Sequence, residues 1–232
     1  MKIRINTHDF SRIFWRDLFS TIATDPVQIN NNLQEISKEQ SALIATAQVQ
    51  TGSVGDSTMW CLYALARAFN PQCVAEVGTY IGNSTLAIAQ AMDLSGPGPK
   101  RIHTCDASNE ISILPNGTTE IFQYKMTSST NMFSDLLARK EIVDMYFIDG
   151  RLAANDSSLM TRIARRETIY VLDDFEGIEK GVVNALGLSE FILATHILVY
   201  PPDRELLSSY GLKDRGLVAA WVPRSIFILS RQ

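Results

Sequence analysis

Short apolar runs alternate with longer amphipathic segments over most of the chain. The runs that predict strands cover 73–77, 101–105, 120–124, 143–148, 169–172 and 194–200. The segments between them that predict helices cover 84–92, 129–139, 157–166 and 178–186. Strands that alternate with helices in this way indicate an α/β fold, in which a mostly parallel sheet carries helices on both faces.

Further elements flank this alternating region. Segments 10–19 and 33–50 predict helices, and a third helix is expected over 57–69, where apolar residues recur at helical spacing before Asn70-Pro71 ends it. The segment 216–230 is apolar but interrupted by Pro223, so it predicts two extended pieces, one of them a closing antiparallel strand. We therefore expect seven strands in all, with extra helices at the N-terminus.

The domain organisation follows from the same pattern. No internal repeat, low-complexity tract or shift in composition divides the chain. We expect an N-terminal helical segment over 1–52 that covers a substrate, followed by one α/β domain over 53–232. A chain of 232 residues with 46% hydrophobic residues is large enough for one sizeable core.

Composition narrows the classes of partner. The net charge of -4 and a pI near 5.4 argue against binding to nucleic acid or to an anionic membrane. No apolar run approaches the roughly 18 residues of a membrane span, and the N-terminus has no signal-like apolar region. Cys61, Cys73 and Cys105 lie in apolar segments without a CxxC pair, which indicates buried, reduced thiols. We expect a cytoplasmic protein.

The turn after the first predicted strand carries the strongest chemical signal. Residues 76–84 read Glu-Val-Gly-Thr-Tyr-Ile-Gly-Asn-Ser, so that Gly78 and Gly82 separate a strand from a helix. Glycines at this point let the backbone approach a ligand, and the helix N–H groups point into the crevice. The Gly-x-x-x-Gly spacing differs from the Gly-x-Gly-x-x-Gly that seats a pyrophosphate, which favours a cofactor without one. Alternatively, the glycines only relieve clashes in a tight turn.

An acidic residue also ends the second predicted strand. Asp106 stands where a carboxylate accepts hydrogen bonds from ribose hydroxyls in folds of this type. The alternative is an exposed helix cap. Together with the glycine turn, Asp106 favours a cofactor that contains a ribose.

Residues 54–57 and 74–85 together resemble a known family. Val-Gly-Asp-Ser, a helix, and then Val-Ala-Glu-Val-Gly-Thr-Tyr-Ile-Gly-Asn-Ser-Thr are similar in order and spacing to the cofactor half of catechol O-methyltransferase and its caffeoyl-CoA-type relatives. The resemblance covers about residues 52–175. It implies a Rossmann-like class I methyltransferase fold, with S-adenosylmethionine as the cofactor.

The resemblance also implies which residues bind that cofactor. Asp106 would hold the ribose with Ala107 beside it, Thr127 or Ser128 would lie near the adenine, and Asp149 would border the site. The residues expected at the methionine end are Val54, Glu76, Gly78, Tyr80, Gly82 and Ser84.

Carboxylates follow the two later strands of the predicted sheet. Asp149 ends one strand, and Asp173 with Asp174 ends the next, so all of them should face the same crevice. Converging carboxylates repel unless they are protonated or bridged by a cation, and oxygen ligands suit Mg²⁺. The alternative is a helix cap and a cofactor contact. The resemblance supports magnesium on Asp149, Asp173 and Asp174, although the family has Asn where this chain has Asp174.

One departure from the family concerns the general base. The family places a lysine three residues after the first metal-binding Asp, whereas this chain has Arg151 and Leu152 in the corresponding loop. An arginine stays protonated, but it could orient an anionic substrate. We therefore take Asp149 and Arg151 as the candidate catalytic residues. Lys180, His8 or a carboxylate could alternatively accept the proton, although a lysine on a predicted helix is more often simply solvated.

These observations predict a methyltransferase that moves the methyl group of S-adenosylmethionine to the hydroxyl of a small molecule, such as a phenol, with the help of Mg²⁺. Two alternatives are metal-independent transfer to nitrogen or carbon, and a non-catalytic subunit that only resembles a methyltransferase. The assembly, including a homodimer, is left open.

Overall fold

The computed structural model describes residues 7–22, 25–47, 52–108, 111–175, 177–189, 195–213 and 217–223. Its strands are β1 (Cys73–Val77), β2 (Arg101–Asp106), β3 (Glu120–Lys125), β4 (Val143–Ile148), β5 (Ala164–Leu172), β6 (Thr195–Tyr200) and β7 (Val218–Pro223). Its helices are α1 (Thr7–Ile22), α2 (Pro26–Ser41), α3 (Asp56–Phe69), α4 (Asn83–Asp93), α5 (Ser129–Ala138), α6 (Asp156–Arg162), α7 (Val183–Ser189) and α8 (Arg204–Ser209). A 3-10 helix, η1 (Ala42–Thr46), follows α2, and a π-helical turn, η2 (Ile178–Val182), precedes α7.

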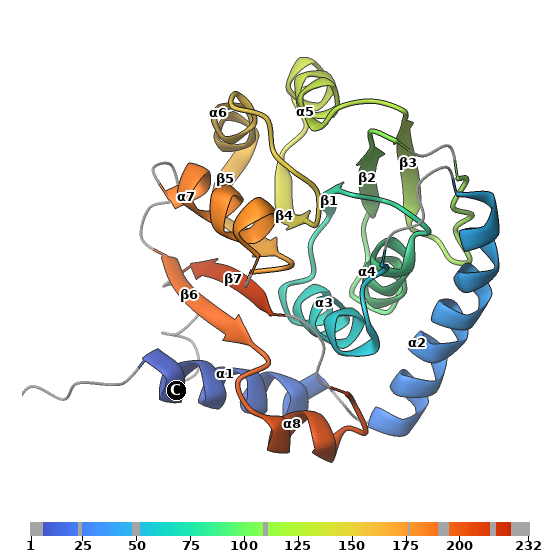
Figure 1. Cartoon of the computed structure of the whole chain (residues 1–232), viewed down its shortest axis with the longest axis vertical. Helices are drawn as coiled ribbons and strands as arrows, with labels where there is room; N and C mark the ends of the chain where they lie inside the picture. The colour runs from blue at the N-terminus through green and yellow to red at the C-terminus, as the bar shows by residue number, and fades with distance from the viewer. Residues whose placement is uncertain are drawn as a thin grey trace, which may run out of the picture.

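The strands form one sheet in the order β3-β2-β1-β4-β5-β7-β6 (Figure 1). Strands β1 to β5 pair parallel with one another, whereas β7 pairs antiparallel with both β5 and β6. The chain order reverses at β1, which has β2 on one side and β4 on the other. In open α/β sheets, the crevice at the carboxyl ends of the strands beside such a reversal is where ligands bind.

Helices cover both faces of the sheet, as the sequence pattern predicted. Figure 1 shows α5 and α6 on one side and α3 and α4 on the other. Successive strand residues point to opposite faces, so Val74 packs into the core with α3 and α4, whereas Ala75 packs into the core with α5 and α6. The predicted α/β fold, with a mostly parallel seven-stranded sheet and helices on both faces, is confirmed.

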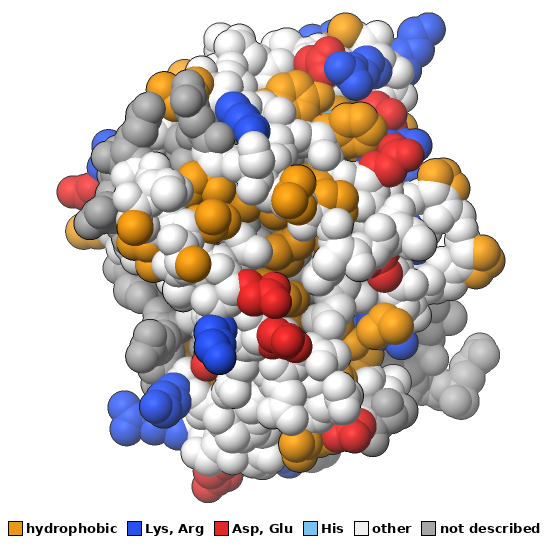
Figure 2. Space-filling view, turned by 90° about the vertical axis from the view of Figure 1, so that its right-hand side faces the viewer, with side chains coloured by type: hydrophobic (Ala, Val, Ile, Leu, Met, Phe, Trp, Pro, Cys, Tyr) orange, Lys and Arg blue, Asp and Glu red, His pale blue; other side chains and the backbone are white. Residues whose placement is uncertain are grey.

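The described part of the face seen in Figure 2 carries basic and acidic side chains interspersed. No continuous basic band crosses the described residues of this face. Among the described residues, no helix has both the length and the apolar character that crossing a membrane requires. The absence of nucleic-acid and membrane partners stays a prediction.

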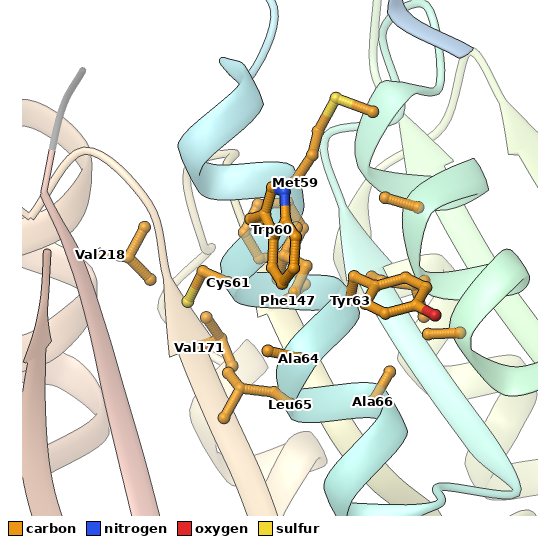
Figure 3. Close-up of a cluster of buried hydrophobic side chains, with 14 of the residues drawn as sticks. Met59, Trp60, Cys61, Tyr63, Ala64, Leu65, Ala66, Phe147, Val171 and Val218 are labelled. Atoms are coloured by element: carbon orange, nitrogen blue, oxygen red, sulfur yellow. The ribbon is translucent and has the colours of Figure 1, made fainter. Parts of the chain in front are cut away.

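Helix α3 is the centre of the larger core. Its residues 57–66 are all buried, because the sheet lies on one side of the helix and α1 and α2 pack on the other. Trp60 is fully buried, and Figure 3 shows it among side chains that come from β4, β5 and β7, including Phe147 and Val171. Its ring lies 5.3 Å from that of Phe19 on α1. Each large side chain buried in this way contributes about 1.5–3 kcal/mol of stability.

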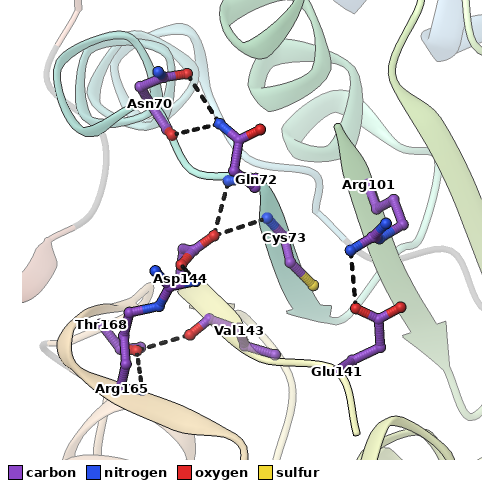
Figure 4. Close-up of polar contacts among 9 residues, drawn as sticks. All are labelled: Asn70, Gln72, Cys73, Arg101, Glu141, Val143, Asp144, Arg165 and Thr168. Atoms are coloured by element: carbon purple, nitrogen blue, oxygen red, sulfur yellow. Dashed lines mark hydrogen bonds and ion pairs between the residues drawn. The ribbon is translucent and has the colours of Figure 1, made fainter. Parts of the chain in front are cut away.

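A polar network closes the amino ends of the central strands (Figure 4). Asp144 Oδ2 accepts hydrogen bonds from the backbone N–H groups of Gln72, at 2.8 Å, and Cys73, at 3.1 Å. Asp144 Oδ1 lies 2.7 Å from Arg165 Nη2. Thr168 Oγ1 donates to the Val143 carbonyl at 2.7 Å, so this end of β4 is tied to β1 and β5.

Several predicted boundaries were wrong for identifiable reasons. The second helix runs over Pro26–Ser41, because Asp25 caps its start and accepts a hydrogen bond from the Gln28 N–H at 3.0 Å. The helix predicted over 157–166 ends at Arg162, since the strand that follows begins at Ala164. Helix α8 was not predicted at all.

Two other predictions can be compared with the fold. The closing antiparallel strand is confirmed as β7, whereas the second extended piece, after Pro223, lies outside the described residues. The cysteines Cys61, Cys73 and Cys105 are buried and free, as predicted.

Candidate active site

A cavity of about 1030 Å³ opens at the carboxyl ends of the strands beside β1. It is larger than many small-molecule sites, so it has room for a nucleoside cofactor and a second small ligand. Most predicted site residues line it: Val54, Gly78, Tyr80, Asp106, Ala107, Thr127, Ser128, Asp149, Arg151, Asp173 and Asp174. The described residues of α1 and α2 do not line it, because these helices pack against α3, α4 and β6 instead.

The glycine turn forms one wall of this cavity. Gly78 has φ +101°, and a Cβ at this position would lie 3.2 Å from both Asp149 C and Gly150 N. A side chain here would therefore both strain the turn and push against the loop after β4. The Gly78 and Thr79 N–H groups donate to the Cys105 carbonyl at 2.9 and 3.2 Å, which joins the end of β1 to β2.

Three of the residues predicted to border the cofactor lie behind the wall. Glu76 is fully buried, and its Oε2 accepts hydrogen bonds from Thr85 at 2.5 Å and Thr104 at 2.6 Å. Ser84, on α4, also hydrogen-bonds to Glu76. Gly82 has φ +85°, and a Cβ there would collide with Ile113. These residues support the turn and do not line the cavity.

Burial changes the pKa of the Glu76 carboxyl. Desolvation raises the pKa of this carboxyl to about 7, although hydrogen bonds from Ser84, Thr104 and Thr85 partly offset the increase. Glu76 Oε1 has no hydrogen-bond partner among the described residues. The same holds for the buried Ser57 Oγ on α3 and Asn83 Oδ1 on α4. Unpaired polar atoms thus lie behind the turn, on residues that do not line the cavity.

Asp106 and the residues after β3 form the next part of the wall. Asp106 Oδ2 accepts a hydrogen bond from the Tyr80 N–H at 2.9 Å, and its Oδ1 accepts one from the Ser108 N–H at the same distance. The Thr127 N–H donates to the Asp106 carbonyl at 3.1 Å. Ser128 caps α5 and accepts a hydrogen bond from the Asn131 N–H at 3.3 Å. These bonds hold Asp106, Thr127 and Ser128 along one side of the cavity.

The later carboxylates converge at the opposite side, as their strand positions predicted. Asp173 is 8% exposed, and burial together with the negative charges of Asp149 and Asp174 raises its pKa to about 7. Burial also raises the pKa of Asp149, against the opposing effect of Lys180. The backbone of Asp174 is left-handed, with φ +51°. This side of the cavity therefore concentrates negative charge in a poorly solvated place.

Lys180 was expected to be solvated on a helix, and this expectation was wrong. It lies on η2, and its Nζ donates to Asp149 Oδ1 at 2.8 Å and forms an ion pair with Asp174 Oδ2. Burial lowers the pKa of Lys180, but the hydrogen bonds and charges of the two carboxylates outweigh this effect and raise it above its usual value. No local motif indicated the contact, because Lys180 and Asp149 are 31 residues apart.

A further ion pair lies at the rim of the cavity. Arg151 Nη2 lies 2.6 Å from Glu179 Oε2, with exposed fractions of 70% and 81% for the two side chains. Arg151 thus bridges the loop after β4 to η2 from the solvent side. The side chain of His8, another residue considered as a base, lies outside the described residues.

The predicted metal ligands do not fit a divalent ion in this arrangement. Asp149 and Asp174 share the Lys180 ammonium, which occupies the space between their carboxylates. Over the described residues, no group of at least three His, Cys, Asp or Glu side chains is placed to hold a metal. The magnesium site stays a prediction that this geometry does not support.

Comparison with known proteins agrees with the fold. Residues 75–175 match a family model described as a methyltransferase domain. No curated protein matches the chain in sequence. An O-methyltransferase from Bacillus cereus, in complex with SAH, is 15% identical, with a TM-score of 0.55 over 93% of this chain and 99% of that one. TomG, an O-methyltransferase from Streptomyces achromogenes involved in tomaymycin synthesis and in complex with SAM, is 13% identical, with a TM-score of 0.53 over 95% and 100%.

At these identities the solved structures establish the fold, and the family model adds the methyltransferase domain. The chain therefore has the class I methyltransferase fold, and its residues 75–175 are similar to a methyltransferase domain. The resemblance inferred from the sequence and the prediction of a methyltransferase are both confirmed at this level.

Proposed function

We propose that this protein transfers the methyl group of S-adenosylmethionine to a hydroxyl group of a small molecule. The observation that supports this most is the cavity itself. One side presents Gly78, Asp106 and Thr127, where a nucleoside cofactor would bind, and the other presents Asp149 and Asp173, where an acceptor hydroxyl would meet carboxylates. That similar folds are O-methyltransferases in complex with SAH or SAM also supports the proposal.

The residues on the cofactor side suit S-adenosylmethionine. The Asp106 carboxylate can accept hydrogen bonds from ribose hydroxyls while the Tyr80 N–H holds it in place. The close backbone approach at Gly78, which lines the cavity, suits the polar methionine end. Thr127 and Ser128 would lie beside the adenine. When bound, S-adenosylmethionine supplies an electrophilic methyl group on a positively charged sulfur.

The residues on the other side would prepare the acceptor. Transfer forms a bond between the acceptor oxygen and the methyl carbon as the bond between that carbon and sulfur breaks, and the hydroxyl proton must leave. Asp149 and Asp173 line the cavity and are carboxylates that can accept this proton. Arg151, at the rim, would contact an anionic part of the acceptor. Holding the oxygen in line with the methyl group is the main contribution that such a site can make.

Cofactor binding and methyl transfer test this proposal separately. Isothermal titration of the full chain with S-adenosylmethionine should show one site, and binding should weaken about 100-fold in Asp106→Ala through the loss of charge-assisted hydrogen bonds. Incubation with methyl-labelled cofactor and a panel of phenols, aliphatic alcohols and amines, followed by mass spectrometry, should show methylated hydroxyl compounds. Absence of cofactor binding would refute the proposal, and methylation of amines alone would refute transfer to oxygen.

A further inference from the structure

The Lys180 side chain reaches across the carboxyl ends of two neighbouring strands. Its Nζ lies 2.8 Å from Asp149 Oδ1 and 3.1 Å from the Asp149 carbonyl oxygen, and it also contacts Asp174 Oδ2. An ammonium group has three N–H donors, and each of these oxygens can accept one of them. Lys180 therefore binds the end of β4 and the segment after β5 together.

The local backbone is built for this contact. Gly181, beside Lys180, packs so closely that a Cβ would lie 2.3 Å from the Asp174 carbonyl oxygen and 2.5 Å from Phe175 Cα. Any other residue at position 181 would push η2 away from the Asp174 backbone. Such π-helical turns are frequent at functional sites. The position of Lys180 is thus set by close packing and not by a flexible side chain alone.

A second contact fixes the same two segments. Asn184, which is 4% exposed, donates through Nδ2 to the Gly150 carbonyl at 2.8 Å and accepts through Oδ1 from the Leu152 N–H at 3.1 Å. Helix α7 is therefore bound to the loop that follows Asp149. Because Gly181 and Asn184, which both follow Lys180 in the chain, are anchored in this way, the Lys180 ammonium is held between the two carboxylates.

We propose that Lys180 is the resident cation of this site and takes the position that a divalent ion would need. The inference rests on the proposed function, because it assigns Lys180 a role beside the acceptor. Lys180 acts as a positioning residue: it holds the Asp149 carboxylate in one orientation and brings positive charge to the side of the cavity where the acceptor oxygen would lie. It also keeps Asp149 and Asp174 from separating through mutual repulsion.

The proposal makes a direct prediction about metal binding. One ammonium already contacts two carboxylates, so a divalent ion can bind Asp149 and Asp174 only if Lys180 leaves. Removal of the ammonium leaves the Asp149 and Asp174 carboxylates without their shared cation, and carboxylates are ligands for hard divalent cations. Lys180 excludes the divalent ion in the natural chain, so its replacement should allow the ion to bind.

Binding of Mn²⁺ alone, followed by electron paramagnetic resonance and isothermal titration, tests this without an acceptor. The natural chain and the exposed-lysine control Lys38→Ala should show no Mn²⁺ site, whereas Lys180→Ala should gain a site for one Mn²⁺. The double variant Lys180→Ala/Asp174→Asn should lose that site. If Lys180→Ala does not fold, as judged by circular dichroism, Lys180→Gln replaces it with the same expected result.

Two results would overturn the proposal. One is a Mn²⁺ site in the natural chain that disappears in Asp149→Asn, because Lys180 would then yield to a metal. The other is a folded Lys180 variant that binds Mn²⁺ no better than Lys38→Ala. Titration of the natural chain with S-adenosylmethionine separates this outcome from failure of the proposed function, since the natural chain should bind the cofactor whichever result the metal gives.

Discussion

The two ends of the sheet use the same kinds of residue for different purposes. At the amino ends, Asp144 satisfies two backbone N–H groups and one arginine within a few residues of β1 and β5. At the carboxyl ends, Asp149 and Asp174 share one lysine, and Asp173 remains buried among like charges. A carboxylate with its own hydrogen-bond and ion-pair partners stabilises the fold. Carboxylates that outnumber the cations beside them destabilise it, and such clusters are typical of ligand-binding sites.

Left-handed backbone conformations occur at both ends of the sheet. Gly78, Tyr80 and Asp174, at the carboxyl ends, have positive φ, and so do Asn70 and Lys140 just before β1 and β4. Conformations of this kind cost about 1–3 kcal/mol for residues other than glycine, and they persist only where the surrounding structure enforces them. Backbone strain therefore does not distinguish the two ends, and the difference between them lies in how their carboxylates are paired.

The largest expected effect comes from filling the glycine turn. Gly78→Val should abolish detectable binding of S-adenosylmethionine, a loss of at least about 100-fold, because the side chain would enter the space between β1 and the loop after β4. Isothermal titration measures it. The matched control is Gly96→Ala, in the loop before β2, where a Cβ would make only an ordinary 3.6 Å contact with Asn70. Equal losses of cofactor affinity in both variants would contradict the view that only the carboxyl ends of the strands form the cofactor site.

The next effect is a pH dependence at Glu76. Its pKa is about 7 in the fold and 4.5 when unperturbed, so the folded chain keeps a proton that the unfolded chain releases. The stability from this group is complete below pH 4.5 and is lost as the pH rises to about 7. Glu76→Gln does not titrate, so its unfolding free energy relative to the natural chain should increase by up to about 3 kcal/mol from pH 5 to pH 8.

Urea denaturation across this pH range measures the difference at Glu76. The comparison variant is Glu141→Gln, near the amino ends, where the carboxylate pairs with Arg101 at 3.0 Å. A difference that stays constant with pH in Glu76→Gln, or one that grows equally in Glu141→Gln, would contradict the assignment.

A smaller effect on stability is expected at the amino ends. Asp144→Ala leaves the Gln72 and Cys73 N–H groups without their acceptor and should lower the unfolding free energy by about 2 kcal/mol. Cofactor affinity should stay within about twofold of the natural chain, since the change lies at the opposite end of the sheet. Urea denaturation and isothermal titration on one preparation measure both quantities. A cofactor affinity that falls as far as in Asp106→Ala would show that the ends are coupled.

The smallest effect is expected at the rim. Arg151 and Glu179 are both strongly exposed, and exposed ion pairs contribute about 0–1 kcal/mol. Arg151→Ala should therefore change the unfolding free energy by less than about 0.5 kcal/mol, and cofactor affinity should be nearly unchanged. Once an acceptor is known, its KM should rise if Arg151 orients an anionic group. A large loss of stability would mean that the pair closes the cavity in a way its exposure does not indicate.

The sequence by itself determined the sheet, the glycine turn and the class of protein. Periodicity predicts strands and helices because each buried face must repeat with the geometry of its own element. Gly78 and Gly82 signal the turn because few other residues accept its backbone conformation. Asp106, Asp149 and Asp173 were placed at one edge because the parallel strands that they follow end there. The boundaries of α2 and α6 were less accurate, because caps and the start of the next strand decide them locally.

Only the tertiary structure decided which cation meets the carboxylates. Lys180 reaches Asp149 because Gly181 packs against the Asp174 backbone and Asn184 binds the loop after β4. No local pattern in the sequence signals these contacts, since they join segments about 30 residues apart. The approach of these segments depends on how helices and loops pack over the sheet. The sequence therefore placed the acidic residues correctly, but their partner was settled by packing between distant elements.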